Sequence, residues 1–143
     1  MADSVLDATV VAFANGNITA RSDGNAFDRR LAAIEQVAYG HRRLRYNQKL
    51  LGEYQQVVQE YRNDVIDLFF SVLADRSFRV RANTLSRQDY AEARRCRWPS
   101  HDQHLLAAAV GGDRPAIFVT ESRHAECAAK VLARFGIHVV DLG

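Results

Sequence analysis

The chain of 143 residues has few of the residues that define several protein classes. Its two cysteines, Cys96 and Cys127, are too few for a disulfide framework. No apolar run approaches the roughly 18 residues that a membrane-spanning helix needs. The first residues, MADSVLDATV, carry acids and no basic region, unlike a secretory signal. We therefore expect a cytoplasmic protein that does not associate with a membrane.

Lysine is also scarce, with 2 lysines against 17 arginines and a net charge of +2. The arginines gather at 42–45, 76–81 and 94–97. A guanidinium group is planar and permanently charged, and it binds phosphate through two parallel hydrogen bonds. The composition therefore has two compatible interpretations, a phosphate-binding surface and a high-GC codon usage that favours arginine over lysine.

The overall composition is that of a folded protein. Hydrophobic residues make up 48% of the chain and charged residues 25%, which argues against disorder and coiled coil. The length suits one domain, 1–143, because two independent cores would need a longer chain. We find no internal repeat, linker or low-complexity segment.

The apolar pattern predicts strands that alternate with helices along the chain. The expected strands are 5–13, 44–46, 78–82, 116–120 and 137–142. The expected helices are 26–39, 48–74, 87–95, 102–110 and 121–135, with Asn25 as the cap of the first and glycines 40, 111, 112 and 136 as stops. Turn signals fill 15–25. This order predicts a three-layer α/β/α sandwich with a mostly parallel central sheet of about four to five strands.

Ligand sites in such sheets lie beyond the carboxyl ends of the strands. Asp7 lies in the first apolar run, where a carboxylate is costly unless it is paired or metal-bound, and a cap of the following turn is the alternative. Glu53 lies early in the helix 48–74, and a solvent-facing position is the alternative. Asp102 opens a helix of small residues, where capping also favours an acid. Glu121 follows the fourth strand and precedes Ser122, a possible N-cap.

Together these acids predict a cluster of oxygen ligands around one crevice. Such ligands suit Mg²⁺ or Mn²⁺. One or two such ions activate a water and hold the leaving oxygen when a phosphodiester is hydrolysed. The arginines would then supply affinity for a nucleic-acid backbone.

Five segments in this order and spacing resemble a PIN domain, a family of metal-dependent nucleases. The segments are VLDATVV, LRYNQKLLGEYQQVV, HDQHLLAAAV, AIFVTES and FGIHVVDL. The resemblance implies a PIN-like fold in which Asp7, Glu53 and Asp102 are metal ligands and catalytic acids. It also implies a catalytic hydroxyl at Thr120.

The chain departs from the PIN pattern at two places. The family often has a Thr-Asn pair after the first acid, where this chain has Ala8 and Thr9. The fourth acid of the family falls on Ser122, and we expect the adjacent Glu121 to serve as the remaining metal ligand. This departure bears on a second metal ion more than on metal binding itself.

The function implied by the resemblance is that of an endoribonuclease that uses Mg²⁺ or Mn²⁺. Small PIN proteins are commonly toxins paired with a protein antitoxin, so RNA and an antitoxin are the expected partners. The wide apolar stripe of the helix 48–74, together with family habit, suggests a homodimer. The RNA contacts are expected from basic residues and histidines, namely Arg42, Arg43, Arg45, Lys49, Arg79, Arg81, His101, His104 and Arg123.

Other interpretations remain open for the site. His101 and His104 could bind zinc together with Cys96 and His124, although a place at the rim of the crevice explains the first two more simply. A PIN-like domain without catalytic activity could bind RNA or a protein partner, and Ser122 favours it. A haloacid-dehalogenase-like phosphatase would need a second acid where Thr9 stands. A flavodoxin-like signalling domain would need paired acids after the first strand.

Overall fold

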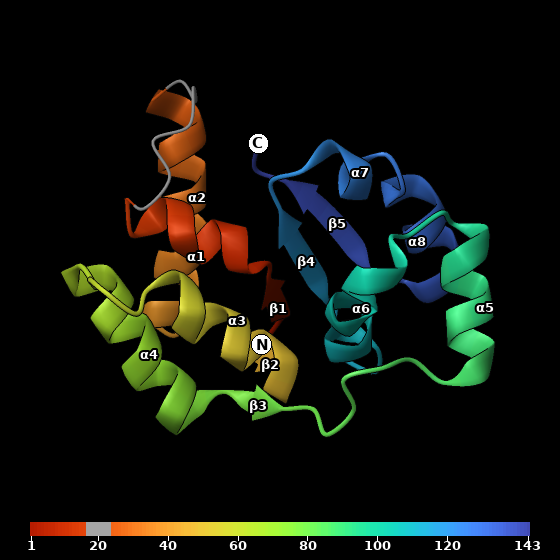
Figure 1. Ribbon diagram of the computed structural model, residues 1–143, viewed down its shortest axis with the longest axis horizontal. Helices are drawn as coiled ribbons and strands as arrows, with labels where there is room; N and C mark the ends of the chain where they lie inside the picture. Colours follow the sequence, from red (N-terminus) through yellow and green to blue (C-terminus); the bar gives the residue numbers. More distant parts are fainter. Residues whose placement is uncertain (17–23) are drawn as a thin grey trace.

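A sheet of five parallel strands forms the centre of the computed structural model, which describes residues 1–16 and 24–143. The strands are β1 (Asp3–Leu6), β2 (Arg43–Tyr46), β3 (Phe78–Arg79), β4 (Ala116–Val119) and β5 (His138–Asp141). They lie in the order β3-β2-β1-β4-β5, and every neighbouring pair is parallel (Figure 1). The apolar strand residues are the reason for this placement, since Val5, Leu44 and Ile117 are fully buried in the core.

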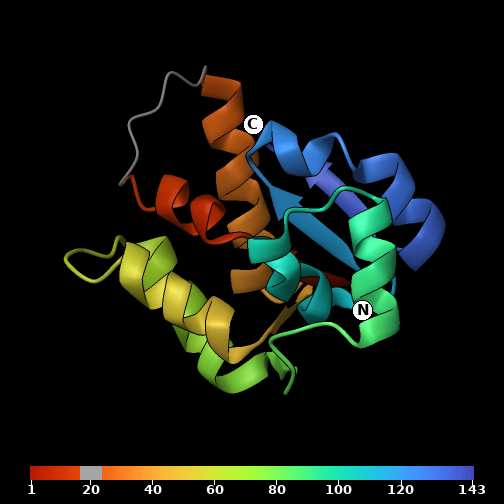
Figure 2. The ribbon, with the colours of Figure 1, turned by 45° about the vertical axis from the view of Figure 1, so that its right-hand side comes forward.

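Helices cover both faces of this sheet (Figures 1 and 2). One layer consists of α1 (Ala8–Ala14), α2 (Gly24–Ala38), α3 (Gln48–Val57) and α4 (Asp64–Arg76). The other consists of α5 (Arg87–Arg95), the 3-10 turn η1 (Ser100–Asp102), α6 (Gln103–Ala109), α7 (Ser122–Ala125) and α8 (Ala128–Phe135). The predicted three-layer α/β/α sandwich with a parallel sheet is confirmed.

The strand order reverses direction next to β1. The chain runs outward from β1 through β2 to β3, then returns to form β4 and β5 on the opposite side of β1. In doubly wound sheets the connections on either side of such a reversal leave the sheet in opposite directions, which opens a crevice at the carboxyl ends of the strands. In this chain that crevice lies where β1 and β4 end.

The sequence predicted one strand over 5–13, but the structure divides this run into a strand and a helix. β1 ends at Leu6, and residues from Ala8 onward form α1. Asp7 keeps an extended backbone, and its carbonyl accepts a hydrogen bond from Val10 N–H at 2.9 Å that closes the first turn. A short continuous apolar run fits a buried strand and a buried helix equally well, which is why the pattern misled. The correction puts Asp7 at the end of the strand.

The predicted helix 48–74 is also wrong, because it is two helices. Val58 leaves the helical region with φ −127° and ends α3. Asn63 begins α4 by accepting a hydrogen bond from Ile66 N–H at 2.9 Å, and its side chain donates to the carbonyl of Ala14 at 2.8 Å. Asn15 adds a hydrogen bond to the carbonyl of Tyr61 at 2.7 Å. The capping and the attachment to α1 therefore outweigh the continuous apolar pattern.

Both halves of that apolar stripe pack into the core of this chain. Its buried members are Leu50, Tyr54, Val58, Ile66, Phe69, Val72 and Leu73. Tyr61 and Leu68 of the same segment remain exposed, and the homodimer that the stripe suggested stays a prediction. In the described residues, no helix combines the length and the apolar character needed to cross a membrane.

The remaining elements differ from the prediction mainly at their ends. β3 has two residues instead of 78–82, and the predicted helix 121–135 is interrupted between α7 and α8. Glu121, not Ser122, precedes α7 as its N-cap residue. Asn25 lies inside α2, which begins at Gly24, so it does not precede that helix as a cap. The predicted loop 15–25 falls partly outside the described residues.

A buried carboxylate ties the amino ends of the strands together. Asp3 has no exposed side-chain surface, and Arg43 donates two hydrogen bonds to it at 2.8 and 3.0 Å. Arg45 lies 3.6 Å away, and Asp113 N–H donates at 2.8 Å. Burial acts to raise the pKa of Asp3, but the hydrogen bonds and positive charges of its partners outweigh burial and hold it below the ordinary value.

We predict that Asn63→Ala lowers the free energy of unfolding by about 1–2 kcal/mol, because it removes the cap of α4 and the bond to Ala14. Urea denaturation followed by circular dichroism measures this. Asn63→Asp is the matched control, since it keeps the capping oxygen and replaces the amide donor by a carboxylate oxygen, so it should cost less. An equal loss in both variants would contradict the capping role.

We predict that Asp3→Asn lowers the free energy of unfolding by about 3 kcal/mol at neutral pH, because it breaks a buried ion pair. The pKa of folded Asp3 is lowered, so this stability is present above the ordinary value of 3.8 and is lost as the pH falls through the folded pKa. The difference between wild type and variant should therefore shrink below about pH 4. Denaturation curves across pH measure it, and a difference that stays constant with pH would contradict the assignment.

Candidate functional site

A pocket of about 280 Å³ lies at the carboxyl ends of β1 and β4. Its lining residues are Asp7, Ala8, Thr9, Glu53, Gln56, Val57, Asp102, Glu121 and Arg123. Four of these are the acids that the sequence singled out. The structure therefore brings together side chains that lie far apart along the chain.

Each acid reaches this pocket because it follows a strand or opens a helix at the same edge of the sheet. Asp7 ends β1 and precedes α1, and Glu53 lies on α3, which follows β2. Asp102 ends η1 directly before α6, and Glu121 lies between β4 and α7. The carboxyl ends of parallel strands meet at one edge, so the segments that follow them converge.

Two threonines hold Asp7. Thr9 Oγ1 donates a hydrogen bond to Asp7 Oδ2 at 3.1 Å, and Thr120 Oγ1 donates to Thr9 Oγ1 at 2.8 Å. The predicted hydroxyl of Thr120 therefore reaches Asp7 only through Thr9, which lines the pocket itself.

Burial raises the pKa of Asp7 above its ordinary value, and the negative charges of Asp102 and Glu121 add to this effect. The positive field of His124 and the hydrogen bond from Thr9 act in the opposite direction without cancelling it. Carboxylates that repel one another across a pocket are an arrangement that a bound cation would stabilise.

Asp102 is surrounded by the side-chain nitrogens of two histidines and an arginine. His124 Nε2 lies 2.8 Å from Asp102 Oδ2, and a nitrogen of Arg123 lies 3.1 Å from the same oxygen. His101 Nε2 is 3.6 Å away. Burial acts to raise the pKa of Asp102, but the hydrogen bond and charge of His124, followed by Arg123 and His101, lower it below the ordinary value.

Glu53 has a buried histidine behind it. His104 Nε2 lies 2.8 Å from Glu53 Oε1, and only 1% of His104 is exposed. This burial does not fit the expectation that His104 contacts RNA. His104 and His124 are instead two buried imidazoles, each of which orients one carboxylate of the pocket.

Arg123 lies between two of the acids. Its guanidinium is 2.6 Å from Glu121 Oε2 and 3.1 Å from Asp102 Oδ2, and a third nitrogen lies 2.6 Å from His101 Nε2. Its side chain is 42% exposed. A donor held in this way can also meet an anion that enters the pocket from solvent. Ser122, which the resemblance aligns with the fourth acid, is exposed and does not line the pocket, whereas Glu121 does.

The donor set of the pocket consists of carboxylate oxygens, which suits a hard cation such as Mg²⁺ or Mn²⁺. Within residues 1–16 and 24–143, however, no three His, Cys, Asp or Glu side chains are placed to hold one metal ion together. Mg²⁺ often keeps several waters and uses only one or two carboxylates directly. The residues therefore fit a partly hydrated cation, and they do not fit a zinc site built from His101, His104, His124 and Cys96.

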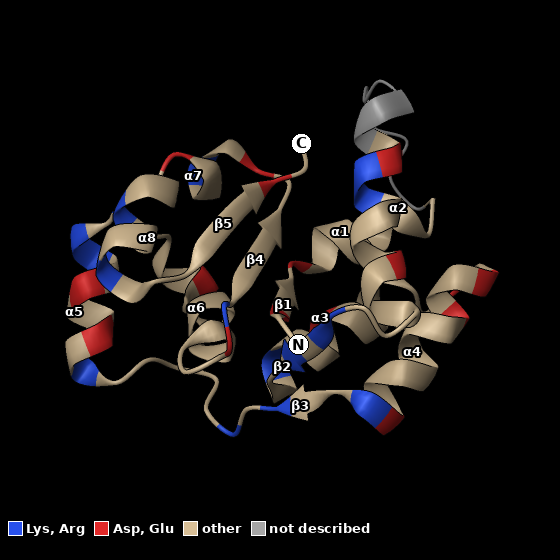
Figure 3. Ribbon diagram, turned by 180° about the vertical axis from the view of Figure 1, so that it is seen from behind, with Lys and Arg blue, Asp and Glu red and all other residues tan. Residues whose placement is uncertain are grey.

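Three arginines of the predicted RNA surface lie at the opposite edge of the sheet. Arg43 pairs in register with Asp3, at the amino ends of the strands. Arg42 donates to Ser4 Oγ and to the carbonyl of Asp3, and Arg45 is 6% exposed and donates to the carbonyls of Ala108 and Val110. In Figure 3 the β2 arginines form a blue segment beside the N-terminus. They stabilise the sheet and do not line the carboxylate pocket.

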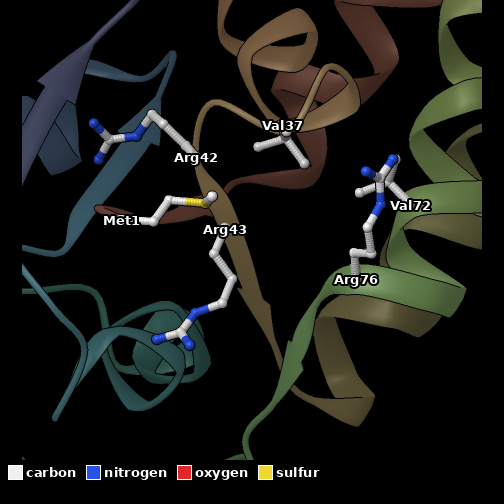
Figure 4. Close-up of a pocket in the computed structure, with 7 residues that line it drawn as sticks. Met1, Val37, Arg42, Arg43, Val72 and Arg76 are labelled. Atoms are coloured by element: carbon white, nitrogen blue, oxygen red, sulfur yellow. The ribbon is translucent and has the colours of Figure 1, made fainter.

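A second pocket, of about 190 Å³, lies at this amino edge. Figure 4 shows Met1, Val37 and Val72 around it, with the guanidinium groups of Arg42 and Arg43 directed away from the space. Because these two charges are bound to the sheet, this pocket presents mainly apolar groups. Arg76, which is exposed, also lines it.

The other basic residues of the prediction remain on the surface. Lys49, Arg79 and Arg81 are exposed. Lys49 Nζ lies 3.4 Å from the carbonyl of His101, next to Asp102, and Arg79 donates to Gln48 at 3.0 Å. Their contact with RNA stays a prediction.

Sequence reasoning missed the roles of Thr9 and His124 at this site. A signal for His124 was present, because a histidine one turn after a buried strand needs a polar partner once it is buried. Trp98 is also part of the support, since it is 3% exposed, donates to the carbonyl of Asp102 at 2.9 Å and packs 4.9 Å from the His124 ring. Trp98 therefore anchors the loop before η1 to the core.

Comparisons of the chain with protein-family models, with curated proteins and with solved structures find no match. The chemistry of the pocket is therefore inferred from the residues of this chain. Those residues define a carboxylate-lined pocket at the switch point of a parallel α/β sheet.

We predict that Arg123→Gln raises the pKa of Asp102 toward its ordinary value of 3.8, because one of the positive charges that lower it is lost. Carbon NMR titration of the side-chain carboxyl groups measures this. Arg134→Gln is the control, since Arg134 pairs with Glu92 at 2.7 Å outside the pocket. An unchanged pKa of Asp102 in Arg123→Gln would show that Arg123 does not act on it.

Proposed function

We propose that this protein is a metal-dependent endoribonuclease of the PIN type, which hydrolyses phosphodiester bonds of RNA. One observation carries the proposal: Asp7, Glu53, Asp102 and Glu121, from four separate segments, line one pocket at the switch point of the sheet. Three of them occupy the positions that the resemblance to PIN domains assigns to metal ligands. The convergence would be unexpected if these acids were ordinary surface or capping residues.

Mg²⁺ or Mn²⁺ is the cofactor that the carboxylates would hold, directly or through water. When bound, such an ion acts as a Lewis acid that activates a water and offsets charge on the phosphate. Asp7, Glu53 and Asp102 are its proposed ligands, and Glu121 is the proposed substitute for the fourth acid.

The surrounding side chains have distinct tasks in this proposal. Thr9 and Thr120 orient Asp7, while His104 and His124 orient Glu53 and Asp102. Among the described residues, Arg123 is the one cation that lines the pocket, and it would donate hydrogen bonds to a phosphate oxygen of the substrate. These groups are already placed before substrate arrives, which lowers the cost of reorganisation during the reaction.

The resemblance also supports the biological setting. A small PIN-type ribonuclease in the cytoplasm would be inhibited by a protein antitoxin. It would also form a homodimer, as such proteins commonly do. These partners rest on the resemblance alone.

A second candidate function is an RNA-binding or protein-binding module that does not cleave. The observation that favours it is the position of Arg123, whose guanidinium lies 2.6 Å from Glu121 and 3.1 Å from Asp102. A positive charge at this point offsets the two carboxylates without a metal ion. The replacement of the fourth acid by Ser122 agrees with this candidate.

We predict that the purified protein cleaves single-stranded RNA in Mg²⁺ or Mn²⁺ and not in EDTA. The Asp7→Asn, Asp102→Asn double variant should lose at least about 100-fold in rate, because two groups that hold the cation lose their charge. The control is Asp64→Asn, Asp75→Asn, which removes the same charge from exposed positions on α4. Gel analysis of end-labelled RNA measures the rates.

The outcomes separate the two candidates. No cleavage in either metal, with RNA still bound, would overturn the nuclease and favour the non-cleaving module. Cleavage that survives both EDTA and the double variant would show that the activity does not arise at this pocket.

A further inference from the structure

A third pocket, of about 270 Å³, adjoins the carboxylate pocket. Its lining residues are Cys96, Arg97, Arg123, Glu126, Cys127 and Lys130. We call it the Arg97 pocket. It lies between the end of α5 and the junction of α7 with α8, two regions that lie side by side (Figures 1 and 2) and that are also joined by the ion pair of Arg134 with Glu92.

Arg123 connects the two pockets, because it lines both of them. On one side its guanidinium faces the carboxylates, and on the other side its side chain borders the space next to Arg97 and Lys130. A linear ligand that fills the carboxylate pocket could therefore continue into the Arg97 pocket without leaving the surface.

The two pockets have opposite charge. The carboxylate pocket has four acids and one arginine in its lining, whereas the Arg97 pocket has Arg97, Arg123 and Lys130 against Glu126 alone. Cys96 and Cys127 are buried and contribute thiols, and burial raises the pKa of each above the ordinary value, which keeps them neutral. The Arg97 pocket is thus a cationic site beside an anionic one.

Arg97 has a backbone conformation that arginine rarely adopts. Its φ is +62°, and it follows Cys96 at the end of α5. The N–H of Arg97 bonds to the carbonyl of Arg94, and the N–H of Trp98 bonds to the carbonyl of Ala93, both at 3.0 Å. This is the Schellman ending of a helix, in which glycine is the usual residue at the left-handed position. An arginine is strained there by about 1–2 kcal/mol.

The strained position is not explained by any bond that the Arg97 side chain makes. In the described part of the chain, neither Arg97 nor Lys130 has a side-chain hydrogen bond or ion pair, whereas Arg43, Arg45 and Arg123 are all paired. The Schellman ending fixes this backbone conformation, and residues in such conformations cluster at functional sites. Two unpaired cations at one pocket are suited to an anionic ligand.

We propose that the Arg97 pocket binds a backbone phosphate of single-stranded RNA next to the phosphate that enters the carboxylate pocket. The proposal rests on the proposed function and adds the path that the substrate follows along the surface. Carboxylates repel a phosphodiester, so affinity for the backbone must come from cations beside the cleavage site. Arg97 and Lys130 would hold the neighbouring phosphate, with Arg123 between the two pockets.

The test uses Arg97→Gly, which removes the charge and also relieves the left-handed backbone. Its melting temperature should equal or exceed that of wild type, so that weaker binding is not a folding defect. Arg114→Gly is the matched control, because Arg114 also has a positive φ of 42°, has a 74% exposed side chain and lines none of these three pockets.

Binding of a short fluorescein-labelled single-stranded RNA of mixed sequence is followed by fluorescence anisotropy in EDTA over a salt series. Arg97→Gly should weaken binding several-fold and reduce the slope of log Kd against log salt by about 0.7, the value for one lost phosphate contact on a single strand. Lys130→Gln should have a similar effect, whereas Arg114→Gly should leave the slope unchanged.

Equal effects of Arg97→Gly and Arg114→Gly would overturn the proposal, as would a wild-type protein that binds no RNA in EDTA. Cleavage is measured separately and keeps the two proposals distinct. Binding that depends on Arg97 without any cleavage would support the Arg97 pocket and overturn the nuclease. Cleavage by wild type together with binding that does not depend on Arg97 would overturn the pocket and leave the nuclease standing.

Discussion

The hydrogen bond from Asp7 N–H to the carbonyl of Phe118, at 3.0 Å, is the contact on which the site depends. It joins the end of β1 to β4 at the point where the strand order reverses, and Asp7 is the last extended residue before α1 begins. Because the backbone is held here, the carboxylate of Asp7 projects into the crevice beside Glu121, which follows β4. The other acids are brought to the same place by the segments that follow neighbouring strands. The site is thus a consequence of the parallel sheet.

The carboxylates of the pocket are kept in place by partners of different kinds. Asp7 is held by hydroxyl groups, Glu53 by a buried imidazole, and Asp102 by an imidazole together with Arg123. Hydroxyl donors orient a carboxylate and leave its charge for a ligand, whereas a guanidinium offsets that charge. Arg123 therefore acts at two places: it lowers the pKa of Asp102, and it also borders the Arg97 pocket.

The charged residues at the two edges of the sheet have different roles. At the amino edge, Asp3 pairs with Arg43 and Arg45 in a buried network that stabilises the strands. At the carboxyl edge, four acids gather in one pocket, and burial raises the pKa of Asp7, with the charges of Asp102 and Glu121 adding to the effect. Both edges contain arginines, but Arg43 and Arg45 are bound in this network, whereas Arg97 borders a pocket beside the acids. A count of arginines along the chain does not distinguish the two groups.

Local patterns in the sequence determined the alternation of strands and helices, and therefore the parallel three-layer fold and the edge where the acids meet. Asp7, Glu53, Asp102 and Glu121 were found because strand ends converge in such a fold. Only the tertiary structure decided that 48–74 is two helices, because the hydrogen bonds of Asn63 to α1 cross a long stretch of chain. It likewise decided that Arg45 and His104 are buried and that Arg97 and Lys130 face one pocket beside Arg123. Burial and pairing depend on which distant segments meet, and residue type and spacing along the chain do not contain that information.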